Sequence, residues 1–408
     1  MSINNPPKDF SILFLDMNSF FASVEQQVQP TLRGIPIGVA PYTGGTGCVI
    51  AASKEAKGRG VKIGLVSEAK KLVPEIKILE ARPALYMLYH KEIKKVIESF
   101  TPYFQPLSID EFIIRLTPRD QNELSARKMA LGLKKTIREK VGDSLTCSIG
   151  IGPSVFLAKM AGERRKPDGL TLVELENLKQ FYAGLQLTDL TGINFRMEAQ
   201  LKNLGIDSPL SLFNLEMGEM IRMLKHWGRL WYFRLRGFEV DDYVIKNKTI
   251  GHSAVLAPEF RTRSGALSVL RKLVFKAGYR LRRENYLAAG INISVNFMGS
   301  AGFHLSRKVA TFSDNATFWA KTEELLKSCP WPGRPILVAV SAFNLTKKSG
   351  EQISIFKEVE KSRAISKALD QINDTFGAET IVPASVFLAK DSAPDRIPFG
   401  RPRYEIMH

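Results

Sequence analysis

Hydrophobic and polar positions divide the chain into a strand-and-helix region, a helical region and a second strand-and-helix region. Residues 10–180 alternate short apolar runs, typical of strands, with segments of helical spacing. Residues 181–244 read as short helices separated by small turns. In the first region the pattern predicts a helix at Gln121–Val141 and strands at Ser11–Leu15, Ile35–Ala40, Cys48–Ala52, Glu111–Leu116 and Leu145–Ile151.

The region after residue 248 predicts a module of its own. Its order is strand, helix, strand, strand, helix and strand, at Thr249–Leu256, Ser264–Arg283, Gly290–Phe297, Phe303–Ala310, Phe318–Lys327 and Pro335–Phe343. This order is typical of one sheet backed by two helices. The tail, Ser349–His408, contains one predicted helix, Lys357–Phe376, followed by polar sequence interrupted by prolines.

Composition excludes several classes of protein. With 408 residues, 44% hydrophobic and 24% charged, the chain is expected to form two to four globular domains of about 100–200 residues each. No run approaches the roughly 20 apolar residues of a membrane-spanning helix, and the N-terminus lacks a signal-peptide pattern. The three cysteines lie far apart without metal-site spacing. We therefore expect a cytoplasmic protein that is not a membrane protein and has no disulfide scaffold or thiolate zinc site.

The net charge of +17 favours a polyanionic partner, either nucleic acid or an anionic membrane surface. Residues 249–348 contain 15 Lys and Arg against 5 Asp and Glu, so more than half of the excess lies in a quarter of the chain. The basic positions of the first helix there either contact DNA phosphates or form a solvated face; they are Arg271, Lys272, Lys276, Arg280 and Arg283.

Three carboxylates lie in apolar surroundings. Asp16 ends the first predicted strand, and Asp110 and Glu111 are flanked by apolar residues on both sides. Adjacent strand residues face opposite ways, but a hairpin turn after Pro106 would relax that restriction. Such acids are costly unless their charge is compensated, and two Mg²⁺ ions would do so and would activate an attacking oxygen. A turn or helix-capping acid beside a surface neighbour is the alternative.

Four ordered motifs carry a resemblance to a known family. They are Asp16-Met-Asn-Ser-Phe-Phe-Ala-Ser-Val-Glu25, Ala52-Ser-Lys-Glu-Ala-Lys-Gly-Arg-Gly-Val61, Ser108-Ile-Asp-Glu111 and Lys159-Met-Ala-Gly-Glu-Arg-Arg-Lys-Pro-Asp-Gly169. Together they resemble the Y-family (translesion) DNA polymerases, most closely the bacterial DNA polymerase IV branch. The resemblance extends from about residue 10 to 400.

The resemblance implies an α/β multidomain protein of right-hand polymerase architecture. Its parts would be an α+β palm, small fingers, a helical thumb with a helix-hairpin-helix, an α+β little finger and a tail. The implied boundaries are 10–24 with 83–180, 25–82, 181–245, 249–346 and 347–408.

The implied activity is template-directed, low-fidelity DNA synthesis on primer–template DNA from deoxynucleoside triphosphates. Asp16, Asp110 and Glu111 would bind two Mg²⁺ ions, for which Mn²⁺ may substitute, with the Met17 carbonyl as a further ligand. A primer 3′-hydroxyl would attack the α-phosphate of the incoming nucleotide.

The nucleotide contacts also follow from the resemblance. Phe21 would be the steric gate that excludes a ribose 2′-hydroxyl, with Phe20 beside it and mainly in the core. Lys166 would contact the triphosphate. Lys54 and Lys57 stand where the family usually has Tyr and Arg, with Arg59 as an alternative phosphate ligand, and Asn18 stands where a second Asp is common. Lys cannot make the bidentate contact of Arg, so the strength of these contacts is open.

Two further segments resemble partner-binding elements. The turn at Gly192 and Asn194, with Lys202 beyond it, resembles a helix-hairpin-helix that holds a DNA phosphate; an ordinary helix–helix turn is the alternative. Because Asn tolerates the left-handed conformation, we expect it to replace a second glycine in this turn. Gln352, Ile355 and Phe356 resemble the peptide that binds the bacterial sliding clamp, with a short edge strand as the alternative.

Three other functional interpretations are weighed. One is a catalytically silent adaptor that binds DNA and the clamp, and another is a basic nucleic-acid-binding protein without polymerase function. The third is a subunit that needs accessory proteins, as in the DNA polymerase V branch. All three carboxylates are present, which favours an active enzyme over the silent adaptor. Activity of the isolated chain would separate a self-sufficient enzyme from the subunit that needs accessory proteins. We expect a monomer at the bacterial nucleoid.

Overall fold

The first strand is apolar on both faces, which places it at the centre of a sheet. In the computed structural model of the chain, Ile12, Leu13, Phe14 and Leu15 are all buried. The structure describes residues 7–45, 47–241, 249–348, 357–377, 379–387, 389–390 and 392–393, without the side chains of 357–360. It divides into two units, Met1–Tyr243 with Arg396–His408, and Val244–Asp395.

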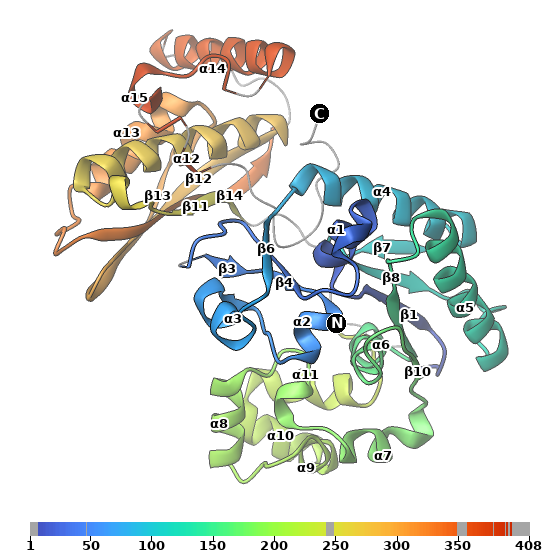
Figure 1. Cartoon of the computed structure of the whole chain (residues 1–408). Coiled ribbons are helices and arrows are strands. Elements are labelled where there is room, and N and C mark those ends of the chain that lie inside the picture. Colours follow the sequence, from blue (N-terminus) through green and yellow to red (C-terminus); the bar gives the residue numbers. More distant parts are fainter. Residues whose placement is uncertain are drawn as a thin grey trace. The chain divides into compact units, whose positions relative to one another are not determined.

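The central sheet of unit 1 has the strand order β10-β9-β1-β8-β7 (Figure 1). Strand β1 runs antiparallel to both of its neighbours, and β10 runs parallel to β9. The strands are β1 Ile12–Met17, β7 Phe104–Pro106, β8 Glu111–Arg115, β9 Cys147–Gly152 and β10 Leu170–Leu172. β1 extends two residues beyond the predicted Leu15, because Asp16 and Met17 still pair with β9.

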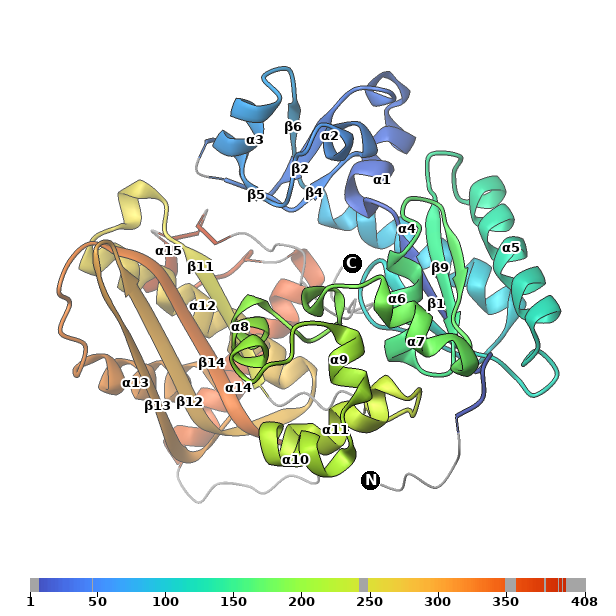
Figure 2. The same ribbon diagram turned by 90° about the horizontal axis from the view of Figure 1, so that it is seen from below.

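Helices cover both faces of this sheet. Leu13 and Leu15 point to the larger core, which contains side chains of α1 (Phe20–Val28), α4 (Pro83–Phe100) and α5 (Glu123–Lys140). Ile12 and Phe14 point the other way, to α6 (Val155–Glu163). Figure 2 shows α5 and α6 on opposite sides of the sheet. The alternation of β1 side chains therefore separates two layers, and Asp16 follows the even-numbered residues toward α6.

Residues 29–82 form two small sheets beside α1. One has the order β4-β2-β6 and the other pairs β3 with β5. The predicted strand Cys48–Ala52 is two strands, because pairing breaks at Ile50 and the two halves join different sheets. The elements are η1 Pro30–Leu32, β2 Ile37–Ala40, β3 Cys48–Val49, β4 Ala51–Ala52, α2 Lys54–Gly58, β5 Gly64–Leu65, α3 Val66–Leu72 and β6 Lys77–Glu80.

The rest of unit 1 is helical within the described residues, as predicted. A core around Trp231 and Tyr182 holds these helices together. They are η2 Leu175–Asn177, α7 Leu178–Ala183, η3 Leu187–Asp189, α8 Phe195–Asn203, α9 Pro209–Asn214, α10 Met217–Leu224 and α11 His226–Leu235.

Unit 2 has a four-stranded sheet of order β11-β14-β12-β13, and the predicted order of its elements is confirmed. Helices α12 and α13 cover one face of the sheet, and the tail helix α14 packs on α13 beyond them (Figure 1). The elements are β11 Thr249–Val255, η4 Pro258–Phe260, α12 Arg263–Arg283, β12 Tyr286–Phe297, β13 Ser300–Phe312, α13 Asn315–Leu326, β14 Pro335–Lys347, α14 Lys357–Phe376 and α15 Ala384–Phe387.

Among the described residues, none of the helices is both long enough and apolar enough to cross a membrane.

Candidate active site

Strand register brings two of the predicted carboxylates together. Asp16 on β1 lies directly opposite Glu111, the first residue of β8. Directly opposite residues of an antiparallel pair project from the same face. Both side chains therefore point to the α6 side of the sheet, although 95 residues separate them in sequence.

The third carboxylate, Asp110, lies in the turn between β7 and β8. The Ser108 hydroxyl donates to Asp110 Oδ1 at 2.5 Å, and the Glu111 amide donates to Ser108 Oγ at 3.1 Å. The Met17 amide donates to the Asp110 carbonyl at 2.9 Å, which fixes the turn against β1. The turn follows Pro106, which itself belongs to β7. The expectation that a hairpin turn frees Asp110 from strand alternation is thus met.

These carboxylates lie in one another's electrostatic field. The pKa of Asp16 is raised to about 7, mainly by burial and also by the charges of Asp110 and Glu111, against the opposing charge of Lys166. Burial also raises the pKa of Asp110, and the hydrogen bond from Ser108 opposes this only in part. Such shifts cluster where a site is arranged to receive a positive charge.

Two lysines contact the carboxylates from the α6 side. Lys166 Nζ lies 3.0 Å from Asp16 Oδ2 and 2.6 Å from Glu163 Oε1. Lys159 Nζ, on α6, lies 2.6 Å from Glu111 Oε1 and 5.2 Å from the centre of the Phe14 ring. Burial lowers the pKa of Lys166, but Asp16 and Glu163 outweigh burial and leave it raised. The Lys159–Glu111 pair has no separate signal in the sequence, because its register depends on α6 packing against β1.

The three carboxylates supply oxygen donors of the kind that Mg²⁺ and Mn²⁺ prefer. Within the described part of the chain, no group of three or more His, Cys, Asp and Glu side chains stands in a metal-holding arrangement. The contact of Glu111 with Lys159 is consistent with this, because it turns that carboxylate toward α6. The donor chemistry nevertheless fits a divalent cation, as does the burial of Asp16 and Asp110, which Lys166 and Ser108 compensate only in part.

A cavity of about 960 Å³ opens beside these carboxylates. Asp16, Met17 and Asp110 line one part of it, while Phe20 and Phe21 line another. Its cations, which come from four separate segments, are Arg33, Lys54, Lys57, Arg138 and Lys166. The site residues predicted from residues 16–166 thus meet at one cavity, except Glu111, which is not among its lining residues.

The lysines of α2 differ in their surroundings. The Lys54 side chain is 76% exposed, whereas burial, with the charge of Lys166, lowers the pKa of Lys57. An added anion would therefore favour the charged form of Lys57. Arg59, the alternative phosphate ligand, pairs with Glu75 and does not line the cavity, so its role stays a prediction.

Phe21 is held from behind by a residue that the motifs do not indicate. Its ring stacks on Tyr86 of α4, with ring centres 4.6 Å apart and an angle of 21° between the planes. The Tyr86 hydroxyl donates to Glu25 Oε1 at 2.7 Å, and Arg82 binds the same carboxylate. Phe21 is only 7% exposed, so it forms the wall of the cavity and not a mobile flap. No sequence pattern pairs Phe21 with Tyr86, 65 residues later.

Asn18 connects the carboxylate strand to the turn that carries Lys166. Its Nδ2 donates to Ser148 Oγ at 2.9 Å, while Oδ1 accepts from the Asp168 amide at 2.8 Å and the Thr146 hydroxyl at 3.2 Å. An Asp at this position could not donate to Ser148. The difference from the family pattern therefore has a local structural role.

The predicted helix-hairpin-helix turn is partly corrected. Gly192 has φ +103°, which requires glycine. Asn194 has φ −95°, so it is extended and not left-handed; it caps α8, accepting from the amides of Arg196 and Met197. Lys202 pairs with Glu198 one turn earlier at 3.0 Å. Asn is used here as a helix cap, which its side chain suits better than the left-handed turn that we expected.

The basic positions of α12 are also corrected in part. Lys272 is 3% exposed and donates to the Ser392 carbonyl at 2.8 Å, so it does not reach a DNA phosphate. Its burial results from the tail, which covers this side of α12. Arg271 lies over the Trp319 ring, Lys276 donates to Ala393 and Arg280 to Gly251. For these three and for Arg283, DNA contact stays a prediction.

The opposite face of the unit 2 sheet carries mainly small and polar residues, with the Phe343 ring beside Gly290 as a large apolar exception. Ile250, Ala342 and Ile291 are buried against the helices, so their sequence neighbours face away from them. By register, the side chains on this open face include Gly251, Ser341, Asn292 and Ser306, then Ser253, Ala339, Ser294 and His304. Lys308 lies on the same face, opposite Gly290.

The predicted clamp-binding residues Gln352, Ile355 and Phe356 lie outside the described residues.

Comparisons with known proteins match most of the chain. Residues 15–163 match the impB/mucB/samB family, and residues 247–355 match the C-terminal domain of that family. The chain is 35% identical to DNA polymerase IV of Moorella thermoacetica, over 91% of this chain and 95% of the relative. It is 32% identical to DNA polymerase IV of Pelotomaculum thermopropionicum, over 91% and 94%.

Solved structures show a similar fold. A chimera of the Y-family DNA polymerases Dbh and Dpo4 matches with a TM-score of 0.73 at 21% identity, over 83% of this chain and 99% of that chain. An insertion ternary complex of Dbh DNA polymerase matches with a TM-score of 0.57 at 22% identity, with the same coverage.

Proposed function

Because the chain belongs to the DNA polymerase IV branch of the Y-family DNA polymerases, we propose that the cavity beside Asp16 joins a deoxynucleotide to a primer end. The predicted family and fold class are confirmed. The chain is a DNA-directed DNA polymerase of the translesion type that uses primer–template DNA and deoxynucleoside triphosphates. The observation that carries the site is the meeting of Asp16 and Asp110 with three lysines at one cavity.

Asp16, Asp110 and Glu111, with the Met17 carbonyl, would hold the divalent cations, for which we propose two Mg²⁺ ions or Mn²⁺ in their place. When bound, the cations supply positive charge that favours loss of the 3′-hydroxyl proton and neutralises the leaving pyrophosphate. The chain's part is to hold the carboxylates on a rigid strand pair and a fixed turn. The primer oxygen bonds to the α-phosphorus as the bond to the β-phosphate breaks.

Lys54, Lys57 and Lys166 would hold the triphosphate. They come from α2 and from the turn after α6, and all three line the cavity. Lys166 would exchange its contact with Asp16 for the triphosphate as the cations take over that carboxylate. Phe21 would close against the sugar 2′ position, supported by Tyr86.

The domain boundaries expected from the sequence are proposed unchanged. The palm would be 10–24 with 83–180, the fingers 25–82, the thumb 181–245, the little finger 249–346 and the tail 347–408. The division between the two units supports a boundary between thumb and little finger. DNA would be held by the turn at Gly192 with Lys202 and by the α12 cations Arg271, Lys276, Arg280 and Arg283. The open face of the unit 2 sheet would be a further contact. These contacts would be to phosphates, without base readout.

A bacterial sliding clamp is proposed as a partner through Gln352, Ile355 and Phe356, on sequence alone. The same holds for a monomer acting in the cytoplasm at the nucleoid.

Primer extension by the purified chain tests the proposal. With Mg²⁺ and four deoxynucleotides, we expect short products that are absent with Asp110→Ala protein, and extension past lesions on damaged templates. Products in both lanes would reveal a contaminating polymerase and remove the support for this site. Salt-sensitive DNA binding without extension would instead favour a subunit that requires accessory proteins, as in the polymerase V branch, or a silent adaptor.

A further inference from the structure

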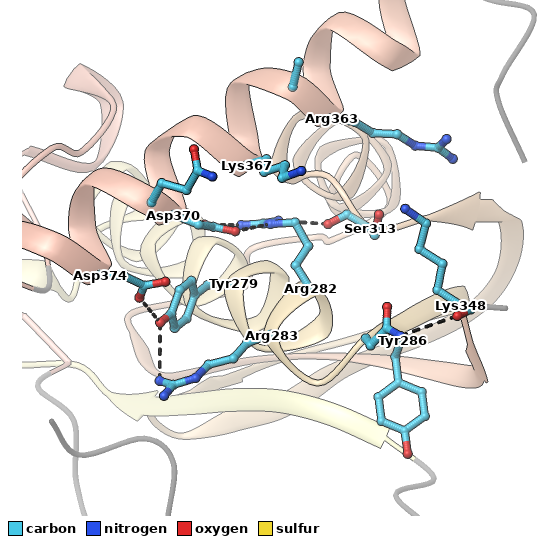
Figure 3. Close-up of a pocket in the computed structure, with 13 residues that line it drawn as sticks. Tyr279, Arg282, Arg283, Tyr286, Ser313, Lys348, Arg363, Lys367, Asp370 and Asp374 are labelled. Carbon is cyan, nitrogen blue, oxygen red and sulfur yellow. Dashed lines mark hydrogen bonds and ion pairs between the residues drawn. The ribbon is translucent and has the colours of Figure 1, made fainter. Parts of the chain in front are cut away.

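Unit 2 contains a second cavity, of about 470 Å³, far along the chain from the candidate active site. Its walls are the end of α12, the start of β12, the loop before α13, and α14 of the tail (Figure 3). It therefore lies on the helical side of the unit 2 sheet, away from the open face of small and polar residues.

The tail wall is fixed by specific contacts. Arg282 Nε and Nη2 donate to Asp370 at 2.6 and 2.8 Å, and the Tyr279 hydroxyl donates to Asp374. Ser362 Oγ donates to Asp314, the N-cap of α13, at 2.6 Å. The cavity is thus composite, because α12 and β12 build one half and α14 the other.

The cavity is strongly cationic. Its lining includes Arg282, Arg283, Lys348, Arg363 and Lys367 against the carboxylates Asp370 and Asp374, which leaves an excess of three positive charges. Asp370 is neutralised by its two-point contact with Arg282. Figure 3 shows the nitrogen ends of Lys348, Arg363 and Lys367 on the side of Ser313, and Arg283 with Tyr279 on the other side. Concave cationic surfaces concentrate field lines and attract anions.

The remaining lining residues indicate the type of anion. They are hydroxyl, amide and aromatic side chains, and Ala364 is the one aliphatic residue among the thirteen that line the cavity. Sites for small organic ligands are instead mostly apolar. Of its two tyrosines, Tyr279 lies beside Arg283, whose guanidinium is 6.0 Å from the ring centre, whereas the Tyr286 ring is covered by Lys347 at 4.0 Å. Cations beside an aromatic ring are typical of surfaces that track a single nucleic-acid strand, where phosphates meet cations and bases stack on rings.

We propose that this composite cavity binds phosphate groups of a single DNA strand. It is a second DNA contact on unit 2, separate from the open sheet face, and it requires the docked tail. This role does not depend on catalysis by the first cavity, because the experiment measures DNA binding and not primer extension.

The test compares three full-length proteins: the wild type, Arg283→Ala/Lys367→Ala, and Lys361→Ala. Lys361 is an exposed cation on the same helix that does not line the cavity, so it controls for loss of charge. The probe is a fluorescein-labelled single-stranded dT oligonucleotide, titrated at several salt concentrations by anisotropy. Equal melting curves check that the substituted proteins fold.

For the double variant we expect the slope of log affinity against log salt to fall by about 1.4, because each phosphate contact to a single strand contributes about 0.7. At low salt the affinity of the double variant for the oligonucleotide should fall about tenfold. The affinity of Lys361→Ala should change less than twofold, because this lysine does not line the cavity. The affinity of the double variant for a blunt DNA duplex, which offers no single strand, should fall less than twofold. Lys367→Glu should reproduce the loss alone.

Three results would overturn the proposal. The first is an unchanged slope in the double variant. The second is displacement of the oligonucleotide from the wild type, but not from the double variant, by inorganic phosphate or pyrophosphate at equal phosphate concentration. That result would assign the cavity to free phosphate or polyphosphate. The third is tighter binding of a poly-glutamate peptide than of the oligonucleotide with the same sensitivity to both substitutions, which assigns it to an acidic protein.

Discussion

At the scale of single residues, the candidate active site is defined by carboxylates that are buried before any cation reaches them. Asp16 and Asp110 have raised pKa values because burial disfavours their charged forms. Lys166 offsets this cost for Asp16, and Ser108 does so for Asp110. In the absence of a cation, the fold therefore disfavours the charged forms of the two carboxylates.

Asp110→Asn keeps the shape of the turn and removes one negative charge. Because Asn cannot supply a charged ligand, extension should fall by at least about 10²–10³, the usual loss on removing one electrostatic group from an active site. DNA binding should change less than twofold. Single-turnover extension and anisotropy measure the two effects, and a parallel loss of DNA binding would show a folding defect instead.

Phe21→Ala should admit ribonucleotides, because the ring forms the cavity wall. We expect the ratio of deoxynucleotide to ribonucleotide kcat/KM to fall about 10–200-fold, the range for one steric contact. Tyr86→Leu removes the stacked support and should give a smaller loss of the same sign. Leu88→Ala, an exposed position on the same helix, serves as control. Unchanged sugar discrimination in Phe21→Ala would refute the gate.

His90 predicts a pH dependence of stability that is separate from catalysis. It is fully buried, its Nδ1 lies 2.7 Å from the Ile109 carbonyl, and burial lowers its pKa to about 4. The unfolded chain thus binds the proton more tightly, so this contribution is present above about pH 6.5 and is lost as the pH falls toward 4.

Between pH 8 and pH 5.5 the loss should be about 1 kcal/mol for unit 1. Urea midpoints at the two pH values measure it, and His90→Asn should lack this part of the dependence. An equal pH dependence in His90→Asn would assign the effect to other groups.

At the scale of elements, the sequence predicts well which segments are helices or strands, but poorly which segments pair with one another. Apolar runs identified β1, and helical spacing identified α5 and α12, because each buries a complete face. The break of the predicted strand at Ile50 was missed, since it depends on two different partner strands. The contacts Phe21–Tyr86 and Lys159–Glu111 were missed for the same reason: each joins segments whose proximity only the packed sheet determines.

The role of Asn194 shows how an element boundary changes a functional assignment. Its side chain accepts from two amides at the start of α8, so it stabilises the helix that follows the proposed DNA-binding turn. Asn194→Ala should cost about 1 kcal/mol of unfolding free energy, the usual value of an N-cap. Asn194→Asp should keep the cap. Chemical denaturation compares the two, and equal losses would show that the cap is not the cause.

At the scale of the whole molecule, the described part of the tail, from residue 357 to 393 with gaps, belongs to unit 2. It meets α12 and α13 through ionic contacts and through Ser366, whose hydroxyl accepts from the Asn315 amide at 3.3 Å. The tail covers one side of α12 and thereby removes Lys272 from the surface. The basic composition of this region predicted nucleic-acid contact, but composition cannot tell a covered cation from an exposed one.

Asp370→Ala leaves Arg282 without its bidentate partner in a mostly buried place. We expect unit 2 to lose about 1–3 kcal/mol of unfolding free energy, the cost of an unsatisfied charged group. Asp370→Ala combined with Arg282→Met should recover part of it. Because the chain has two units, melting should be followed by a probe in unit 2, such as the fluorescence of Trp319 in a variant without other tryptophans. No recovery in the double variant would argue against the pair.

The Asn18 side chain links two segments of the candidate active site. One amide group ties the end of β1 to β9 and to the turn that carries Lys166. Because one Asn18 side chain binds both segments, a shift of the end of β1 should also move the turn that carries Lys166. Substitutions at position 18 should consequently impair cation and nucleotide affinity in step, whereas substitutions at Lys166 impair one of them alone.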